Sequence, residues 1–112
     1  MIKIKRVYEP REPNDGARFL VERLWPRGVK KQDLHMEGWL KELAPSDGLR
    51  RWFGHDPAKW RDFRRRYFDE LRTKDVCKVI RAAAHRGNVT LLYSARDEEH
   101  NNALALKAYF EK

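Results

Sequence analysis

Apolar and polar residues alternate at the start of the chain, whereas apolar residues follow one another near its end. The two patterns predict two kinds of β-strand. Residues 2–8 alternate isoleucine with lysine before Arg-Val-Tyr, a period typical of a half-buried strand. Residues 88–94 hold an unbroken apolar run, which predicts a strand buried on both faces. A further strand is predicted over residues 17–24, rich in Phe, Leu and Val. The intervening residues 9–16 hold two prolines and predict a loop, with a hairpin turn at Asp15-Gly16 as the alternative.

Helical periodicity dominates the middle of the chain and its end. Large apolar residues recur at positions 60, 63, 67 and 71, which predicts an amphipathic helix. It follows Asp56-Pro57, an N-cap acid with proline at the first helical position. Residues 29–43 fit neither the helical nor the strand period. The predicted helices are a short one capped by Ser46 and ended by Gly54, then 56–73, 74–85, and 97–110 with Asp97 as its N-cap.

The order strand, strand, helices, strand, helix predicts a single small α/β domain, residues 1–112, with a mainly parallel central sheet flanked by helices. Four Trp, four Tyr and five Phe are sufficient for a packed core. The helical section before the last strand is longer than one crossover needs. We therefore expect it to form a lid or a wall.

The single cysteine, Cys77, excludes an intramolecular disulfide and a cysteine metal cluster, and it favours a reducing compartment. The four histidines lack metal-ligand spacing, so neither a metal nor another cofactor is predicted. The chain starts without an apolar leader, and no apolar stretch approaches the roughly 20 residues of a membrane span. We therefore expect a cytoplasmic protein without a membrane partner. The pattern carries no signal for an oligomeric state.

Positive charge is in excess and unevenly spread. The net charge is +8, and residues 1–31 hold nine Lys/Arg against four Asp/Glu. Such an excess favours anionic partners, namely nucleotides, phosphorylated metabolites or nucleic acid. Simple solubility is the alternative explanation.

The most specific motif is Arg23-Leu24-Trp25-Pro26-Arg27-Gly28, at the end of a predicted strand. Pro26 lacks a backbone donor and should end the strand, and Gly28 permits a turn. In open α/β sheets, ligands bind outside the carboxyl ends of parallel strands. Two other segments, 6–8 and 94–97, would converge on the same edge.

We predict that guanidinium groups there hold a phosphate or carboxylate, supplied by Arg6, Arg23, Arg27 and Arg96. Tyr8 and Trp25 would stack on a planar group. The alternative is that Arg23 pairs with an internal acid such as Glu22 or Glu37, and that Trp25 is a core residue. The residues thus favour an enzyme or binding protein for an anionic, planar ligand, and they leave open which of the two it is.

The segment Ser94 to Asn101 joins the last strand to the last helix, whose free N–H groups can bind an anion. It lacks the glycines of a P-loop. Ser94 and Asn101 are predicted to contact the ligand. His100, with Asp97 or Asn101, is the group predicted to move a proton, and a surface or packing histidine is the alternative.

A stripe of arginines, Arg61 and Arg64 to Arg66, suggests a nucleic-acid interface. Acids four residues away predict local ion pairs, so a solvated helix face is favoured. The expected pairs are Asp62–Arg66, Arg65–Asp69 and Arg66–Glu70. A third alternative is a non-catalytic interaction module anchored by Trp39, Trp52 or Trp60.

Four segments, residues 23–28, 39–46, 49–57 and 90–101, together resemble the YeaO-like family, a prokaryotic domain family of unknown function. The resemblance covers nearly the whole chain. It implies a single α/β domain of this size and no assigned activity. A sister branch of the wider family carries a Cys-His pair after the last strand. This chain has His100-Asn101 there, and the departure argues against thiol or metal chemistry at that position.

Overall fold

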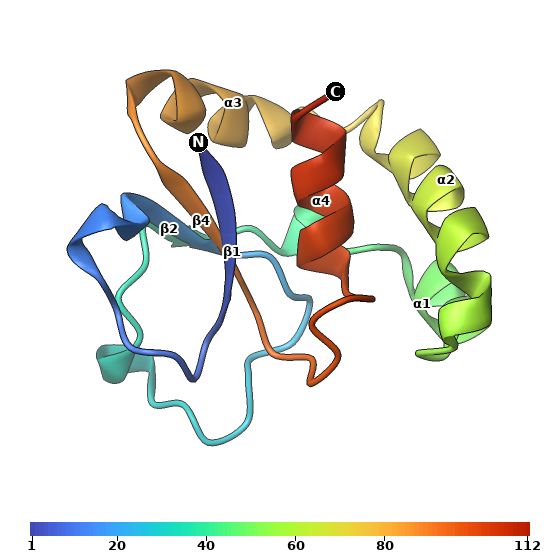
Figure 1. The fold of residues 1–112 in the computed structure, drawn as a ribbon, viewed down its shortest axis with the longest axis horizontal. Helices are drawn as coiled ribbons and strands as arrows, with labels where there is room; N and C mark the ends of the chain where they lie inside the picture. The colour runs from blue at the N-terminus through green and yellow to red at the C-terminus, as the bar shows by residue number, and fades with distance from the viewer.

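The computed structural model describes all 112 residues and contains one four-stranded sheet, in which every neighbouring pair of strands is parallel (Figure 1). The strand order is β1-β4-β2-β3. The most apolar strand, β4, lies between β1 and β2, and Leu91 is opposite both Ile4 and Phe19. The predicted α/β class with a parallel sheet is therefore confirmed. The strands are β1 (Ile2–Arg6), β2 (Ala17–Leu20), β3 (Gly38–Trp39) and β4 (Val89–Tyr93).

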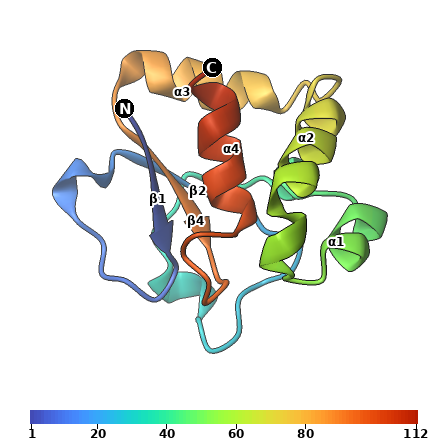
Figure 2. The same cartoon turned by 45° about the vertical axis from the view of Figure 1, so that its right-hand side comes forward.

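The helices cover one face of the sheet. The helix α4 packs on β1 and β4, and Figure 2 shows α2 beside α4. The helix α1 packs on α2, and α3 contacts β4. None of these helices combines the length and the apolarity that crossing a bilayer requires. The helices are α1 (Asp47–Phe53), α2 (Trp60–Leu71), α3 (Cys77–Arg86) and α4 (Asn102–Phe110).

Alternating residues of the sheet enter two different cores. Phe19, Val89 and Leu91 join the large core under the helices, which also holds Tyr67 of α2. Leu20 and Leu92 point the other way, into a small core covered by the loop after β2. The sheet is thus buried on both faces, by helices on one side and by a loop on the other, so that all five residues of β4 are buried.

Several predicted helix boundaries are confirmed. Ser46 caps α1 by accepting from the Leu49 N–H at 3.2 Å, and Gly54 ends it in the left-handed conformation. Asp56 accepts from the Ala58 N–H at 3.0 Å, and a 3-10 turn, Pro57–Lys59, leads into α2. These caps satisfy N–H groups that a helix start leaves without a partner.

Other expectations were wrong. β2 ends at Leu20 rather than at residue 24, and Asp15-Gly16 forms no hairpin because β1 and β2 are both parallel to β4. The last helix begins at Asn102, with Asn101 as its N-cap. Asp97 accepts from the N–H groups of Glu99 and His100 and so closes a separate turn before that helix. Both residue types cap turns, so composition did not distinguish them.

Candidate functional site

A cleft of about 560 Å³ lies where the segments that follow β2 and β4 meet the end of α1. Residues 22–27 form one wall, residues 44–55 contribute a second, and residues 94–102 a third. The carboxyl ends of β2 and β4 point to the same edge because the strands are parallel, which is where such sheets bind ligands.

The base of the cleft is apolar. The rings of Phe53 and Phe63 stack there with centroids 4.3 Å apart, and both side chains are buried. Ala44 and Pro45 extend this base. An apolar base under a rim of a few polar groups is the usual construction of a small-molecule site.

Positive charge dominates the rim. Four arginines, Arg23, Arg27, Arg50 and Arg51, line the cleft, and Glu22 is the one lining acid. Glu22 is already engaged, because its carboxylate accepts from the Ser94 N–H at 2.9 Å. The cleft therefore presents more cationic groups than its own acids neutralise, which favours an anionic occupant.

The four arginines differ in their partners. Arg23 and Arg50 each lie 3.3 Å from the same carboxylate oxygen of Asp47, and all three side chains are nearly half exposed. Ion pairs this exposed are weak. Arg27 and Arg51 are exposed and form no ion pair. The alternative that Arg23 pairs with an acid of the chain itself is confirmed, but this acid is Asp47 rather than Glu22 or Glu37.

His100 lines the cleft and is held in place by a carboxylate. Its Nδ1 lies 2.9 Å from Asp97 Oδ2, and its ring meets Trp60 edge-on with centroids 5.5 Å apart. The backbone N–H of Glu99, aided by His100, holds the pKa of Asp97 below its ordinary value. Asp97 does not itself line the cleft. The pair therefore positions an imidazole at the cleft with an ionised carboxylate next to it.

His55 also lines the cleft, and its backbone is strained. It has φ 57° and directly follows Gly54, which has φ 54°. A non-glycine residue in this left-handed region is uncommon, and such residues concentrate at functional sites. The sharp turn after α1 places this second imidazole at the cleft.

The structure brings most of the predicted site residues together. Those lining the cleft are Tyr8, Arg23, Trp25, Arg27, Ser94, His100 and Asn101. Arg96 is exposed outside it, and Arg6 is committed elsewhere. The Arg6 guanidinium donates to the carbonyls of Ser94 and Ala95, at 3.3 and 2.9 Å, and so ties β1 to the segment after β4.

The two predicted stacking residues are not equivalent. Tyr8 is 47% exposed, its hydroxyl donates to the Arg27 carbonyl at 3.0 Å, and the Arg6 guanidinium lies 4.9 Å from its ring centre. Trp25 packs on the small core, meets Trp39 edge-on, and donates its indole N–H to the Val29 carbonyl at 2.7 Å. Tyr8 thus retains the more accessible ring.

The side chain of Asn101 already forms hydrogen bonds within the protein. Its Oδ1 accepts from the Leu104 N–H at 2.8 Å, and its Nδ2 donates to the Asp97 carbonyl at 3.0 Å. The residue is buried at the edge of the cleft. Its observed contacts fix the start of α4 and the turn that carries His100.

Sequence reasoning missed the contribution of α1. No site role was predicted for Arg50 and Arg51, which lie in the segment 49–57, yet both line the cleft beside Arg23. The available signal was the buried pair Leu49 and Phe53, four residues apart, which leaves the arginines between them exposed.

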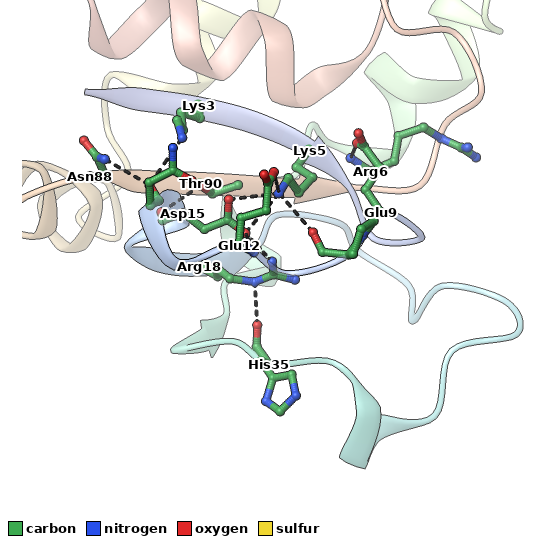
Figure 3. Close-up of polar contacts among 12 residues, drawn as sticks. Lys3, Lys5, Arg6, Glu9, Glu12, Asp15, Arg18, His35, Asn88 and Thr90 are labelled. Atoms are coloured by element: carbon green, nitrogen blue, oxygen red, sulfur yellow. Dashed lines mark hydrogen bonds and ion pairs between the residues drawn. The ribbon is translucent and has the colours of Figure 1, made fainter.

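A second group of charges, which we name the Asp15 cluster, consists of Lys5, Glu12, Asp15 and Arg18 (Figure 3). Asp15 and Arg18 are only 1% and 4% exposed, and their side chains are 2.5 Å apart. Lys5 bonds Asp15 at 2.9 Å and Glu12 at 2.7 Å. Arg18 also donates to the His35 carbonyl at 2.7 Å. Two cations thus face two carboxylates, and the cluster is balanced within itself.

The surroundings of Asp15 strongly lower the pKa of its carboxyl group. Burial alone raises the pKa of a carboxyl group, but hydrogen bonds from Lys5, the Glu12 backbone and Arg18 outweigh it. Together they lower the pKa of Asp15 to about 2. Its carbonyl also accepts from the buried Thr90 hydroxyl at 2.8 Å, which joins the cluster to β4.

The ion pairs expected along α2 were wrong. The observed pairs are three residues apart, Arg65 with Asp62 at 3.6 Å and Arg72 with Asp69 at 3.4 Å. Glu70 instead accepts from Ser46 at the start of α1. Arg66 lies 4.2 Å from the ring centre of Trp52. Packing against α1 therefore removes Glu70 and Arg66 from the expected local pairing.

Comparison with known proteins places the chain in a family. Residues 1–112 match a family described as the inactive DUF488-N3 subclade. The uncharacterised protein YeaO of Escherichia coli (strain K12) is 44% identical, over 94% of this chain and 92% of its own length. An uncharacterised protein of Mycobacterium tuberculosis (strain ATCC 25618 / H37Rv), Rv3073c, is 36% identical, over 94% of this chain and 89% of its own. No solved structure matches.

The domain is thus a parallel α/β protein with a basic cleft at the carboxyl ends of its central strands. The chain belongs to the inactive DUF488-N3 subclade, and the predicted resemblance to YeaO-like proteins is confirmed.

Proposed function

We propose that the cleft binds a small anionic ligand that carries a planar group, either a nucleotide or a phosphorylated metabolite. The main support for this proposal comes from two arginines that have no acidic partner. Arg27 and Arg51, from segments far apart in the sequence, both line one cleft with an apolar base, and neither has an acidic partner. A guanidinium group binds a phosphate through two parallel hydrogen bonds.

The remaining groups of the rim support the same ligand. Asp47 holds Arg23 and Arg50 weakly, so a phosphate can take over its place between the two guanidinium groups. The His100 ring lines the same cleft. The accessible ring of Tyr8 offers a stacking surface for the planar group.

We assign the cleft to binding rather than to catalysis. The description of the family as inactive supports this choice. The hydroxyl of Ser94 lies 3.4 Å from the Glu22 carboxylate, and His100 hydrogen-bonds Asp97, so no hydroxyl–imidazole pair of a nucleophilic site is formed. In this proposal, Asp97 positions the His100 ring at the cleft.

Isothermal titration calorimetry at low ionic strength tests the proposal, with pyrophosphate and nucleoside mono-, di- and triphosphates as probes. The variant Arg27→Gln/Arg51→Gln should bind at least about tenfold more weakly, because hydrogen bonds between charged groups each contribute about 1.5 to 3 kcal/mol. The control Arg86→Gln/Lys31→Gln removes two exposed, unpaired charges elsewhere and should stay within about twofold. Absence of binding to every probe, or equal weakening in both variants, would contradict the proposal.

A further inference from the structure

Outside the cleft, the helices form a surface that we name the aromatic–cation patch. It combines aromatic rings from α2 and α4 with cationic groups from α2, α3 and the end of the chain. Figures 1 and 2 both show the carboxyl end of α4 beside α3, with α2 alongside. The patch consists of Phe68, Tyr109, Phe110, Arg64, Arg81 and Lys112.

The rings of the patch contact one another and remain partly accessible. The centroids of Phe68 and Tyr109 are 5.3 Å apart, and those of Tyr109 and Phe110 are 5.5 Å apart. None of the three is buried. The three rings pack against the large core and leave part of their surface accessible, on which other planar groups can stack.

Each cation of the patch lies over a ring rather than beside a carboxylate. Arg81 is 5.6 Å from the centre of Tyr109 and 5.3 Å from that of Phe110. Lys112 and Arg64 lie 4.9 and 5.8 Å from the centre of Phe68. None of the three forms an ion pair, so the positive charge of the patch is uncompensated.

A separate observation at Arg64 indicates that the patch lacks a hydrogen-bond acceptor. Its Nε is buried and has no hydrogen-bond partner. An unpaired donor on a charged group is unfavourable, and it would gain an acceptor if the guanidinium turned toward a bound phosphate. The solvated helix face expected from the sequence does not account for this orphaned donor.

We propose that the aromatic–cation patch binds single-stranded nucleic acid. Sequence-tolerant binders of single strands combine cationic groups that follow the phosphates with aromatic side chains on which bases stack, and the patch holds both. A second copy of this chain fits poorly, because it would bring together two proteins that each carry a net charge of +8. The patch shares no residue with the cleft lining, so the two proposals are independent.

Fluorescence anisotropy with a labelled oligothymidylate of about 15 nucleotides tests this inference. The variant Arg81→Gln/Lys112→Gln should bind several-fold more weakly. Its slope of log K against log salt should fall in magnitude by about 1.4, which corresponds to two lost phosphate contacts. The control Lys30→Gln/Lys31→Gln removes two exposed charges outside the patch and should retain most of the affinity.

Stacking is tested separately at Tyr109. Tyr109→Leu keeps an apolar side chain but removes the ring, and it should weaken binding by about fivefold or more, while Tyr109→Phe should retain it. Poly-glutamate serves as a probe for an acidic polypeptide partner. If it binds as tightly as the oligonucleotide and Tyr109→Leu changes neither affinity, the nucleic-acid proposal is overturned.

A final variant separates this inference from the proposed function. Arg27→Gln/Arg51→Gln should retain oligothymidylate binding, whether or not the cleft binds nucleotides. If this variant loses the oligonucleotide while Arg81→Gln/Lys112→Gln keeps it, the strand binds at the cleft and the patch proposal is wrong. Absence of binding by the unmodified protein at low salt also overturns it.

Discussion

The Asp15 cluster and the cleft both contain arginine beside the central strands, but only the arginine of the Asp15 cluster is fully paired with an acid. In the Asp15 cluster, Arg18 is buried, bonds Asp15 at 2.5 Å and donates to a carbonyl. At the cleft, Arg27 and Arg51 are exposed and have no acidic partner. The same side-chain chemistry is therefore satisfied internally at one place and left available at the other.

Desolvation explains the contrast. A buried guanidinium loses its water, so a fold can keep it only with a close carboxylate and further hydrogen bonds. An exposed guanidinium keeps its water and needs no such partner. The paired region should therefore control folding stability, and the unpaired region should control ligand binding.

The largest effect is expected from Asp15→Asn, which leaves Arg18 buried without its carboxylate. We expect a loss of about 3 to 5 kcal/mol in the free energy of unfolding, the range for breaking a buried ion pair from one side. Urea denaturation measures this. Asp69→Asn is the matched control, because its pair with Arg72 is mostly exposed, and it should change stability by less than about 1 kcal/mol. If Asp15→Asn and Asp69→Asn lowered the free energy of unfolding equally, the buried pair would be no more important for stability than the exposed one.

A smaller but clear loss is expected from Gly16→Ala. Gly16 has φ 66°, and an added Cβ would lie 2.1 Å from the Asn88 carbonyl oxygen. The turn that carries Asp15 would have to move away from the residue before β4. We expect destabilisation on the order of 2 kcal/mol or more, measured by thermal and urea unfolding. Gly48→Ala, where a Cβ meets nothing within 4 Å, provides the control.

Acid should weaken the fold through Asp15. Its pKa is about 2 in the folded protein and 3.8 as the ordinary value, so the unfolded chain takes up the proton first as the pH falls. The stabilisation, about 2 kcal/mol, is therefore complete above about pH 4 and is lost between about pH 4 and pH 2. Urea midpoints across this range should fall less steeply for Asp15→Asn than for the unmodified protein. If the urea midpoints of both proteins fell equally with pH, Asp15 would not be the source of the acid sensitivity.

The smallest effect on stability is expected at the cleft. Arg27→Gln/Arg51→Gln removes exposed, unpaired charges, so the free energy of unfolding should change by no more than about 0.5 kcal/mol per substitution. The same variant should lose affinity for phosphorylated ligands. A loss of stability similar to that of Asp15→Asn would show that these arginines hold the fold together instead.

The sequence was informative where local rules apply. The caps at Ser46 and Asp56 and the buried strand β4 follow from residue types and spacing alone. The parallel-sheet rule also predicted that residues 23–27 meet residues 94–97, and the cleft contains residues 23–27 together with Ser94 and Ala95.

The remaining features depend on packing between distant segments. Arg51 reaches the cleft because Leu49 and Phe53 of α1 enter the large core, which no local spacing specifies. Arg6 was expected at the rim, but its guanidinium donates to two backbone carbonyls. Asp15 gave no local sign that a turn acid would be buried against Arg18. Contacts between segments therefore decide which charges are paired.

The most direct measurement is a crystal structure of the protein with pyrophosphate. We predict an anion in the cleft, in hydrogen-bond contact with the guanidinium groups of Arg27 and Arg51, while the ion pairs of the Asp15 cluster are unchanged. An empty cleft at saturating pyrophosphate, or an anion held only on other surfaces, would contradict the claim that these unpaired arginines form a binding site.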